Sequence, residues 1–313
     1  MKSITIAFAL LTITLLGANP LLAKPNLHAG ILVVDPGDPD AYVEIQDAVD
    51  AASPGDTIKV HAGTYGPVVI STDDLTIKAA DDDSSPVVDA TGFEVGVLID
   101  ANGVTVKGLT ARNATLNGED FAYGFEVIGD NNTLINNTAT DSANGIGIFG
   151  SAGNSLKGNL AEGNDYGFTI AFASNITLKG NTAHGNGIGF AVIFGDAVTL
   201  KENTASGNET IGIWVVVSSF VTLKENSSYE NRDGYQIIAN VGTSAKENEA
   251  FANDRHGFII AFGENGSSFK ENRADGNGEY GFFILQYLLD DEFKENECSG
   301  NGLGGSNVPG ICD

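Results

Sequence analysis

The sequence is poor in the side chains that bind soft metals and in basic side chains. Its only methionine is Met1, and its four histidines are scattered (His28, His61, His184 and His256). Copper sites need His, Cys or Met ligands, so no copper role is expected. Sixteen lysines and arginines face 41 acidic residues, which gives a net charge of −25. Such a surface repels nucleic acid and anionic lipid, and it would hold an acidic polymer best through bridging cations, which leaves Ca²⁺ open as a cofactor.

Long apolar runs are absent after the first 23 residues. Residues 1–23 begin Met-Lys, continue with an apolar run from Ile4 to Leu16 and end in small residues at Ala23, which is typical of a secretory signal peptide. That run is shorter than the roughly 20 residues of a membrane span, although an uncleaved anchor is the alternative. We therefore expect a secreted, periplasmic or cell-surface protein with no membrane span after signal cleavage.

The two cysteines, Cys298 and Cys312, both lie in the last sixteen residues. An exported compartment allows them to pair, and no histidine or further cysteine lies near them to complete a metal site. The sequence therefore predicts a disulfide that fixes the C-terminal end.

A motif of about 22 residues repeats through the C-terminal two thirds of the chain. Each copy has a tetrapeptide ending in Asn, such as LKGN at 156–159 or FKEN at 293–296, and a Gly-aromatic or Gly-aliphatic pair such as Gly167-Phe168. The apolar stretches between Gly, Asn and Ser residues are three to five residues long, which indicates short strands and excludes long helices. Coils of this size bury their apolar faces by stacking about 4.8 Å apart. The prediction is an all-β, right-handed parallel β-helix over residues 24–313.

Alternation within the strands predicts which side chains face inward. The residue after each repeat Gly and the residue two further on form inward columns, such as Phe168 and Ile170. The repeated Asn residues are expected to form structural ladders. Residues 41–52 have helical spacing, so we expect an N-terminal cap over 41–55 that covers an open β-edge, coils over about 56–301 and a C-terminal cap over 302–313.

Two segments resemble known families. EIQDAVDAASPGDTIKVHAGTYGPVVI (44–70) is similar to the N-terminal segment of pectin-lyase-like β-helix proteins, and the coils with N-x-x-x-x-N-x-x-G followed by Phe or Ile resemble the NosD-type repeat. The resemblance implies an extracytoplasmic β-helix whose partners are carbohydrates, and it covers nearly the whole mature chain. The fold hosts lyases, hydrolases, epimerases and non-catalytic surface proteins. No catalytic motif of pectate lyases, pectin methylesterases or polygalacturonases is present.

Seven of the twelve lysines occupy one column of the repeat, as Lys201 and Lys224 do, and glutamates such as Glu202 and Glu225 follow them in five coils. The simplest interpretation is a solvated ladder of ion pairs, each of small energy. A row of glutamates that binds Ca²⁺ is the alternative.

Candidate catalytic residues are those that the repeat does not dictate, just before the Gly of the last three coils. They are Arg232, Asp233, Arg255, His256 and Tyr280, with Glu279 as a candidate for substrate binding. On a uronic acid, an arginine would neutralise the carboxylate, and His256 or Tyr280 would remove the adjacent proton while the other protonates the opposite face or the leaving oxygen. A charged turn satisfied by neighbouring coils is the simpler alternative.

The position two residues after each repeat Gly points outward but is mostly apolar. It holds Ala191, Trp214, Ile259 and Phe283, with Gln236 between them. Such a strip is typical of an oligomer interface, of a sugar-stacking platform in which Trp214 and Gln236 bind substrate, or of a surface covered by a loop. Two functions follow: a polysaccharide-binding protein with lyase or epimerase activity, or a non-catalytic structural protein that forms homo-oligomers.

Overall fold

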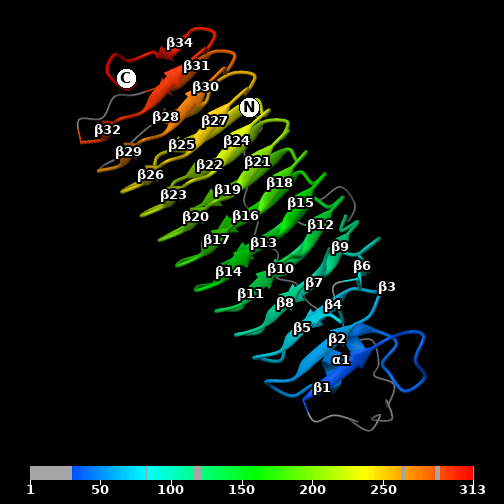
Figure 1. The fold of residues 1–313 in the computed structure, drawn as a ribbon. Coiled ribbons are helices and arrows are strands. Elements are labelled where there is room, and N and C mark those ends of the chain that lie inside the picture. Colours follow the sequence, from blue (N-terminus) through cyan, green and yellow to red (C-terminus); the bar gives the residue numbers. More distant parts are fainter. Residues whose placement is uncertain (1–29, 82, 116–121, 262–265, 286–289, 313) are drawn as a thin grey trace.

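The computed structural model describes residues 30–81, 83–115, 122–261, 266–285 and 290–312. These residues form one elongated right-handed parallel β-helix, in which three sheets run along the whole length (Figure 1). The fold predicted from the repeat is therefore confirmed. The predicted signal peptide, residues 1–23, lies outside the described residues.

From β2 onward each coil contributes one strand to each sheet, and all strand pairs are parallel. Sheet A consists of β1 (Ile31–Val34), β2 (Thr57–Val60), β5 (Thr76–Ala79), β8 (Thr105–Lys107), β11 (Thr133–Ile135), β14 (Ser155–Lys157), β17 (Thr177–Lys179), β20 (Thr199–Lys201), β23 (Thr222–Lys224), β26 (Ser244–Lys246), β29 (Ser268–Lys270) and β32 (Glu292–Lys294). Sheet B consists of β3 (Gly63–Tyr65), β6 (Pro86–Asp89), β9 (Thr110–Arg112), β12 (Thr138–Thr140), β15 (Leu160–Glu162), β18 (Thr182–His184), β21 (Thr204–Ser206), β24 (Ser227–Tyr229), β27 (Glu249–Phe251), β30 (Arg273–Asp275) and β33 (Glu297–Ser299). Sheet C consists of β4 (Val68–Ile70), β7 (Val95–Ile99), β10 (Tyr123–Val127), β13 (Asn144–Phe149), β16 (Tyr166–Ala171), β19 (Ile188–Ile193), β22 (Ile211–Val216), β25 (Asp233–Ile238), β28 (Phe258–Ala261), β31 (Tyr280–Ile284) and β34 (Gly304–Ser306).

The corner between sheets A and B is tight because one residue there has a left-handed backbone. Gly158 and Gly180 occupy this position with φ of +65° and +63°, and later coils place a glutamate there, such as Glu225 at φ +56°. A non-glycine residue in this region costs roughly 1 kcal/mol. The turn directs the next residue, an asparagine, into the interior.

The core is a set of columns that run along the axis. The predicted inward residues are buried, and their aromatic rings stack on one another: Phe168 on Phe190 at 4.7 Å, and Tyr235 on Phe258 at 4.5 Å. Ile170 is buried in the second predicted column. Stacked burial of this kind replaces the helix-on-sheet core that a globular domain would need.

Two asparagine ladders line the interior corners, as predicted. In the first, Asn226 Nδ2 donates to Leu200 O (2.8 Å) and to Asn248 Oδ1 (2.9 Å), and its Oδ1 accepts from Asn203 N (2.9 Å). The second ladder repeats this pattern through Asn186 and its equivalents. Within the two ladders, backbone groups and neighbouring asparagines satisfy the side-chain amides, which supports a structural rather than a catalytic role.

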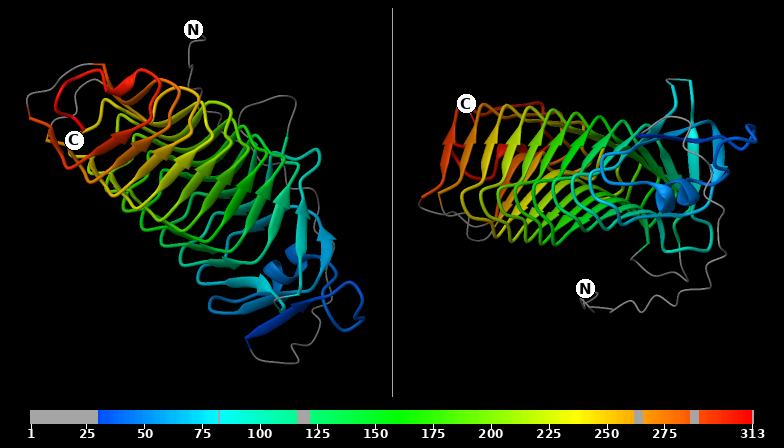
Figure 2. Two further views of the ribbon diagram at one scale, coloured as in Figure 1. Left: turned by 45° about the horizontal axis from the view of Figure 1, so that its top comes forward. Right: turned by 90° about the horizontal axis from the view of Figure 1, so that it is seen from below.

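The N-terminal end is closed by the helix α1 (Ile45–Ala51), which lies within the predicted range 41–52. Ile45, Ala48 and Val49 are buried and belong to the same core as the first coils, and the helix contacts β1, β2 and β4 (Figure 2). One strand was not predicted: β1 precedes the helix and pairs with β2, so sheet A begins before the cap. Residues 31–34 carry no Gly or Asn of the repeat, which is why the pattern missed them.

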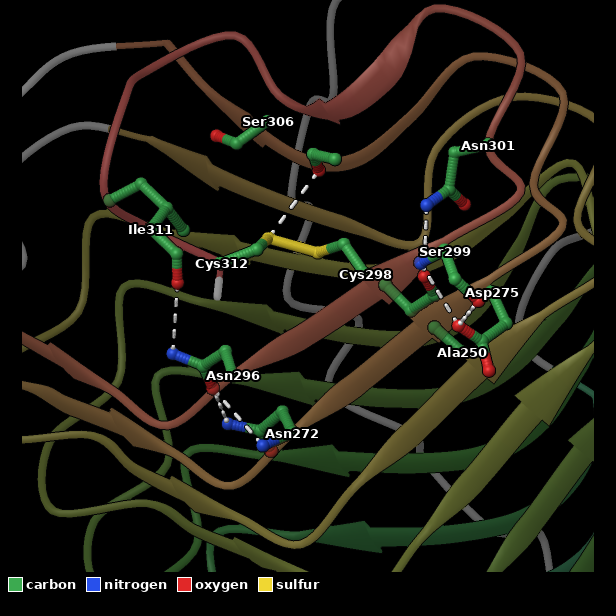
Figure 3. Close-up of a disulfide and its surroundings, with 12 residues drawn as sticks. Ala250, Asn272, Asp275, Asn296, Cys298, Ser299, Asn301, Ser306, Ile311 and Cys312 are labelled. Atoms are coloured by element: carbon green, nitrogen blue, oxygen red, sulfur yellow. Dashed lines mark hydrogen bonds between the residues drawn. A yellow bond between two sulfur atoms is a disulfide. The ribbon is translucent and has the colours of Figure 1, made fainter.

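The C-terminal end is closed by β34 and the Cys298–Cys312 disulfide, whose Cα atoms are 5.7 Å apart. Ile311 is buried against the core, and its carbonyl accepts a hydrogen bond from Asn296 at the end of the first ladder (Figure 3). The disulfide therefore holds a short segment over the last coil, where the tail 302–313 was expected to cap it.

The outer face of sheet A carries the predicted ion-pair ladder. Lys201 Nζ lies 3.0 Å from Glu202 and 3.6 Å from Glu225 of the next coil, and Lys224 repeats the arrangement with Glu225 and Glu247. Each carboxylate is thus paired with ammonium groups rather than gathered with other carboxylates. Among the described residues, no helix has the length and apolar character of a membrane span.

Candidate functional site

The candidate catalytic residues lie at or just before the first residues of β25, β28 and β31, which are neighbouring strands near the C-terminal end of sheet C (Figure 1, yellow to orange). Asp233 begins β25, His256 lies just before β28, and Tyr280 begins β31, so the three side chains occupy one column in successive coils. Arg255 and Glu279 each precede one of them. Asp233, Gln236, Arg255, His256, Glu279 and Tyr280 are called the acid–base cluster below.

Asp233 is the buried centre of the cluster. Its side chain is 4% exposed and accepts hydrogen bonds from the backbone N–H of His256 (3.3 Å) and from Gln236 Nε2 (3.1 Å). Arg255 Nε lies 3.6 Å from the same carboxylate. These contacts hold Arg255 and the His256 backbone against one buried carboxylate, so Asp233 positions its neighbours.

His256 has a different place from the one expected. It is buried (2% exposed), its Nδ1 accepts the backbone N–H of Tyr280 (3.3 Å), and its Nε2 lies 3.1 Å from Glu279 Oε2. Because Nδ1 accepts, the ring proton is on Nε2 and is donated to Glu279. Its ring also stacks on Phe283 at 4.5 Å. Both ring nitrogens are thus engaged, and the Nε2–H holds the Glu279 carboxylate.

Burial lowers the pKa of His256 below its usual 6.5, although the carboxylates of Glu279 and Asp233 act in the opposite direction. The imidazole is therefore neutral at pH 7, which agrees with its acceptor bond from the Tyr280 backbone.

Four groups of this surface remain accessible. The Glu279 side chain is 41% exposed and that of Arg255 37% exposed, Tyr280 is half-buried, and Arg232 is exposed. The Glu279 carboxylate, the Tyr280 phenol and the guanidinium groups of Arg255 and Arg232 are thus accessible to solvent. This set contains a base, an acid and a counter-ion for an anionic substrate group.

The apolar strip beside the cluster is not exposed as a whole, which corrects the expectation. Ala191 and Ile259 are buried, and only Trp214, Gln236 and Phe283 are partly accessible. The five side chains are in register along sheet C, so Trp214 lies next to Gln236, which bonds to Asp233. Trp214 therefore borders the acid–base cluster.

The sequence interpretation missed Glu126, although it occupies the same outward position two residues after a repeat Gly. Burial, together with repulsion from Glu94, raises the pKa of Glu126 to about 7. It lies on β10, far along sheet C from the cluster, between Leu98 and Gly147. Listing the outward column coil by coil would have revealed it.

Among the described residues, no three His, Cys, Asp or Glu side chains converge as ligands of one metal ion. The glutamates of sheet A pair with lysines instead.

Comparison with known proteins shows the fold family of the chain. The family model "Right handed beta helix region" matches residues 95–274 and 189–310, which together span about two thirds of the chain. The chain belongs to this family. No curated protein matches it in a sequence comparison.

Solved structures share the fold at low identity. The A-module of the Azotobacter vinelandii mannuronan C-5 epimerase AlgE4 has a TM-score of 0.63 at 15% identity, covering 85% of this chain and 92% of that one. The pectate lyase Pel9A has a TM-score of 0.60 at 15% identity, covering 85% and 79%. The GH136 lacto-N-biosidase from Eubacterium ramulus has a TM-score of 0.64 at 13% identity, covering 89% and 68%. At these identities the likeness shows the fold alone.

Proposed function

We propose that this is an exported β-helix protein that binds a polysaccharide on the outward face of sheet C and processes a uronic acid unit there, by a lyase or epimerase type of reaction. The observation that carries the proposal is the acid–base cluster, in which Arg255, Glu279 and Tyr280 face solvent over a buried Asp233–His256 support. The structural neighbours named above include an epimerase and a lyase, which supports this reaction class.

The cluster supplies each group that such a reaction needs. Arg255 would neutralise the uronate carboxylate and so acidify the adjacent C5–H, and Arg232 offers a second cation nearby. Glu279, held by the Nε2–H of His256, would remove that proton. In an epimerase, the Tyr280 hydroxyl would return a proton to the opposite face. In a lyase, the C4–O bond breaks as the C4=C5 double bond forms, and the same hydroxyl would protonate the leaving oxygen.

Trp214 and Gln236 extend the surface along sheet C, so they would hold the neighbouring sugar unit. Trp214 offers an apolar ring, and Gln236 is fixed by Asp233. The net charge of −25 opposes an acidic polymer, so binding should strengthen when Ca²⁺ is added.

Turnover is tested by incubating the protein with alginate, pectate and neutral glycans, with and without Ca²⁺. Lyase activity gives unsaturated-uronate absorbance, and epimerase activity changes the proton NMR spectrum of the polymer. The variant Glu279→Gln should abolish either product with the fold intact. Absence of turnover and of binding across the whole panel would refute the proposal.

A second candidate function, self-association of a structural protein, rests on a different apolar surface from the one predicted. Phe172, Phe194, Val217 and Phe220 are 42–63% exposed and have left-handed backbones. The first three stand at one position of successive turns between sheets C and A, and Phe220 lies three residues after Val217. Phe172 and Phe194 stack at 4.9 Å. Bulky residues are costly in this conformation. Because these four side chains are uncharged and apolar, we infer that they would pack against the same side chains of a second copy of the chain.

Sedimentation velocity tests this alternative. A dimer that dissociates in Phe172→Ser/Phe194→Ser would support it. A strictly monomeric protein at high concentration would exclude it.

A further inference from the structure

A surface pocket lies on sheet B, whose strands β27 and β30 precede the strands of the acid–base cluster in the same coils. It has a volume of about 320 Å³ and is lined by Glu249, Ala250, Phe251, Arg273 and Asp275, which belong to β27 and β30. These residues are called the notch. The notch shares no side chain with the acid–base cluster.

The notch forms where an aromatic stack ends. Tyr229 and Phe251 follow one another on sheet B, and their rings stack at 4.7 Å with an interplanar angle of 12°. The next residue in register is Asp275, which has no ring to continue the stack. Phe251 is 37% exposed, so the face of its ring that points away from Tyr229 borders the notch.

The Asp275 side chain leaves this space open because its carboxylate is bonded to a residue of the following coil. Its Oδ1 accepts hydrogen bonds from Ser299 Oγ (2.6 Å) and from Ser299 N (3.1 Å) in the following coil (Figure 3). Its Oδ2 pairs with Arg273 Nε. Asp275 therefore fixes the guanidinium at the rim of the notch, where 58% of the Arg273 side chain stays exposed.

We propose that the notch binds a neutral sugar unit, with the apolar face of the pyranose on the Phe251 ring. An aromatic face beside fixed polar groups suits a ring that is apolar on one face and carries hydroxyls at its edge. Arg273 donates to hydroxyl oxygens, while Glu249, which is exposed and forms no ion pair within the described residues, accepts from hydroxyl protons.

The charges of the notch select against other ligands. Glu249 and Asp275 carry two negative charges and Arg273 one positive charge, on a protein of net charge −25, so a uronate would be repelled. An organic cation would be repelled by the guanidinium of Arg273, which already neutralises Asp275. The notch therefore favours a neutral sugar, whereas the acid–base cluster would bind a uronate. Sugar binding in the notch does not depend on the proposed reaction.

Titration calorimetry and saturation-transfer NMR test this site on the full chain. The probes are cellohexaose, mannohexaose and maltohexaose, with hexagalacturonate and tetramethylammonium as charged comparisons. We expect at least one neutral hexasaccharide to bind, Phe251→Ala to weaken it about tenfold, and Phe251→Tyr to retain it.

Phe93→Ala is the matched control, because it removes another exposed phenylalanine outside the notch and should leave the affinity unchanged. Thermal unfolding of each variant shows whether a loss of affinity comes from a loss of folded structure. Failure of all three neutral hexasaccharides to bind would overturn the proposal, as would equal affinity in Phe251→Ala or binding of tetramethylammonium alone. Loss of turnover in Glu279→Gln with unchanged neutral-sugar binding separates this site from the proposed function.

Discussion

At the scale of single residues, burial decides which repeated side chains are structural. Asn226 and Glu225 are sequence neighbours in the same turn, yet the amide is fully buried in a ladder and the carboxylate is partly exposed between two lysines. Removing a buried amide leaves several partners unsatisfied, whereas removing an exposed ion pair costs little.

Asn226→Ala should therefore lower the free energy of unfolding by about 3 kcal/mol, because Leu200 O and the Asn203 amide lose their partners inside the core. Glu225→Gly is the matched control and should change it by less than about 1 kcal/mol, since glycine suits the left-handed backbone. Denaturant titration followed by circular dichroism measures both. Equal effects of the two substitutions would contradict the ladder's role.

Glu126 links stability to pH. Its pKa is raised to about 7, so folding favours the protonated form, and this contribution is present at acidic pH and is lost as pH rises through 7. Glu126→Gln should stabilise the protein by about 2 kcal/mol at pH 8 and by almost nothing at pH 4. Unfolding titrations at the two pH values measure the difference. A stabilisation independent of pH would show that the carboxyl is not strained by burial.

The pH dependence of turnover should report on His256. With its pKa lowered, the imidazole stays neutral above 6.5, and protonation below that value would remove the acceptor for the Tyr280 backbone N–H. We expect kcat/KM to be flat above pH 6.5 and to fall on the acid side at lower pH. His256→Gln should move that fall to lower pH, and an unchanged profile would argue against a positioning role.

At the scale of elements, the two ends of the solenoid are closed in different ways. The helix α1 covers the first coils with apolar side chains, while the last coil is covered by a short segment that the Cys298–Cys312 bond holds in place. Closed ends are necessary because an open parallel edge would recruit other chains.

The double variant Cys298→Ser/Cys312→Ser should lose about 3 kcal/mol of local stability, because it frees a loop of fourteen residues. Hydrogen exchange should accelerate in β33 and β34 and stay unchanged in β16 and β19, which lie in the middle of the solenoid. Faster exchange along the whole chain would instead mean that the cap supports the entire fold.

At the scale of the whole molecule, the repeat made the fold predictable, but it did not indicate which outward side chains bond to one another. Columns of Phe, Ile and Asn determine which residues face inward, so the sheets and ladders could be derived from spacing. The strand β1 could not, because it precedes the repeat. The cluster's column was also predictable, since Asp233, His256 and Tyr280 stand at one position of successive coils.

The bonds within that column could not be predicted from spacing. His256 was expected to face a substrate, but its ring lies flat on Phe283 and its two nitrogens are bonded to neighbours 23 and 24 residues further along. Side-chain rotamers decide this, and the repeat does not constrain rotamers at outward positions. The notch was missed for a similar reason, because it depends on where a stack of rings ends.

Binding of a uronate at the acid–base cluster is tested most directly by titration calorimetry. The affinity for a uronate oligosaccharide is measured for the unaltered protein, Arg255→Ala and Lys179→Ala. Both substitutions remove one exposed cation, the first at the acid–base cluster and the second on sheet A. We expect hexamannuronate or hexagalacturonate to bind, with about tenfold weaker affinity in Arg255→Ala and unchanged affinity in Lys179→Ala. Equal affinities in all three proteins, or no binding at all, would contradict it.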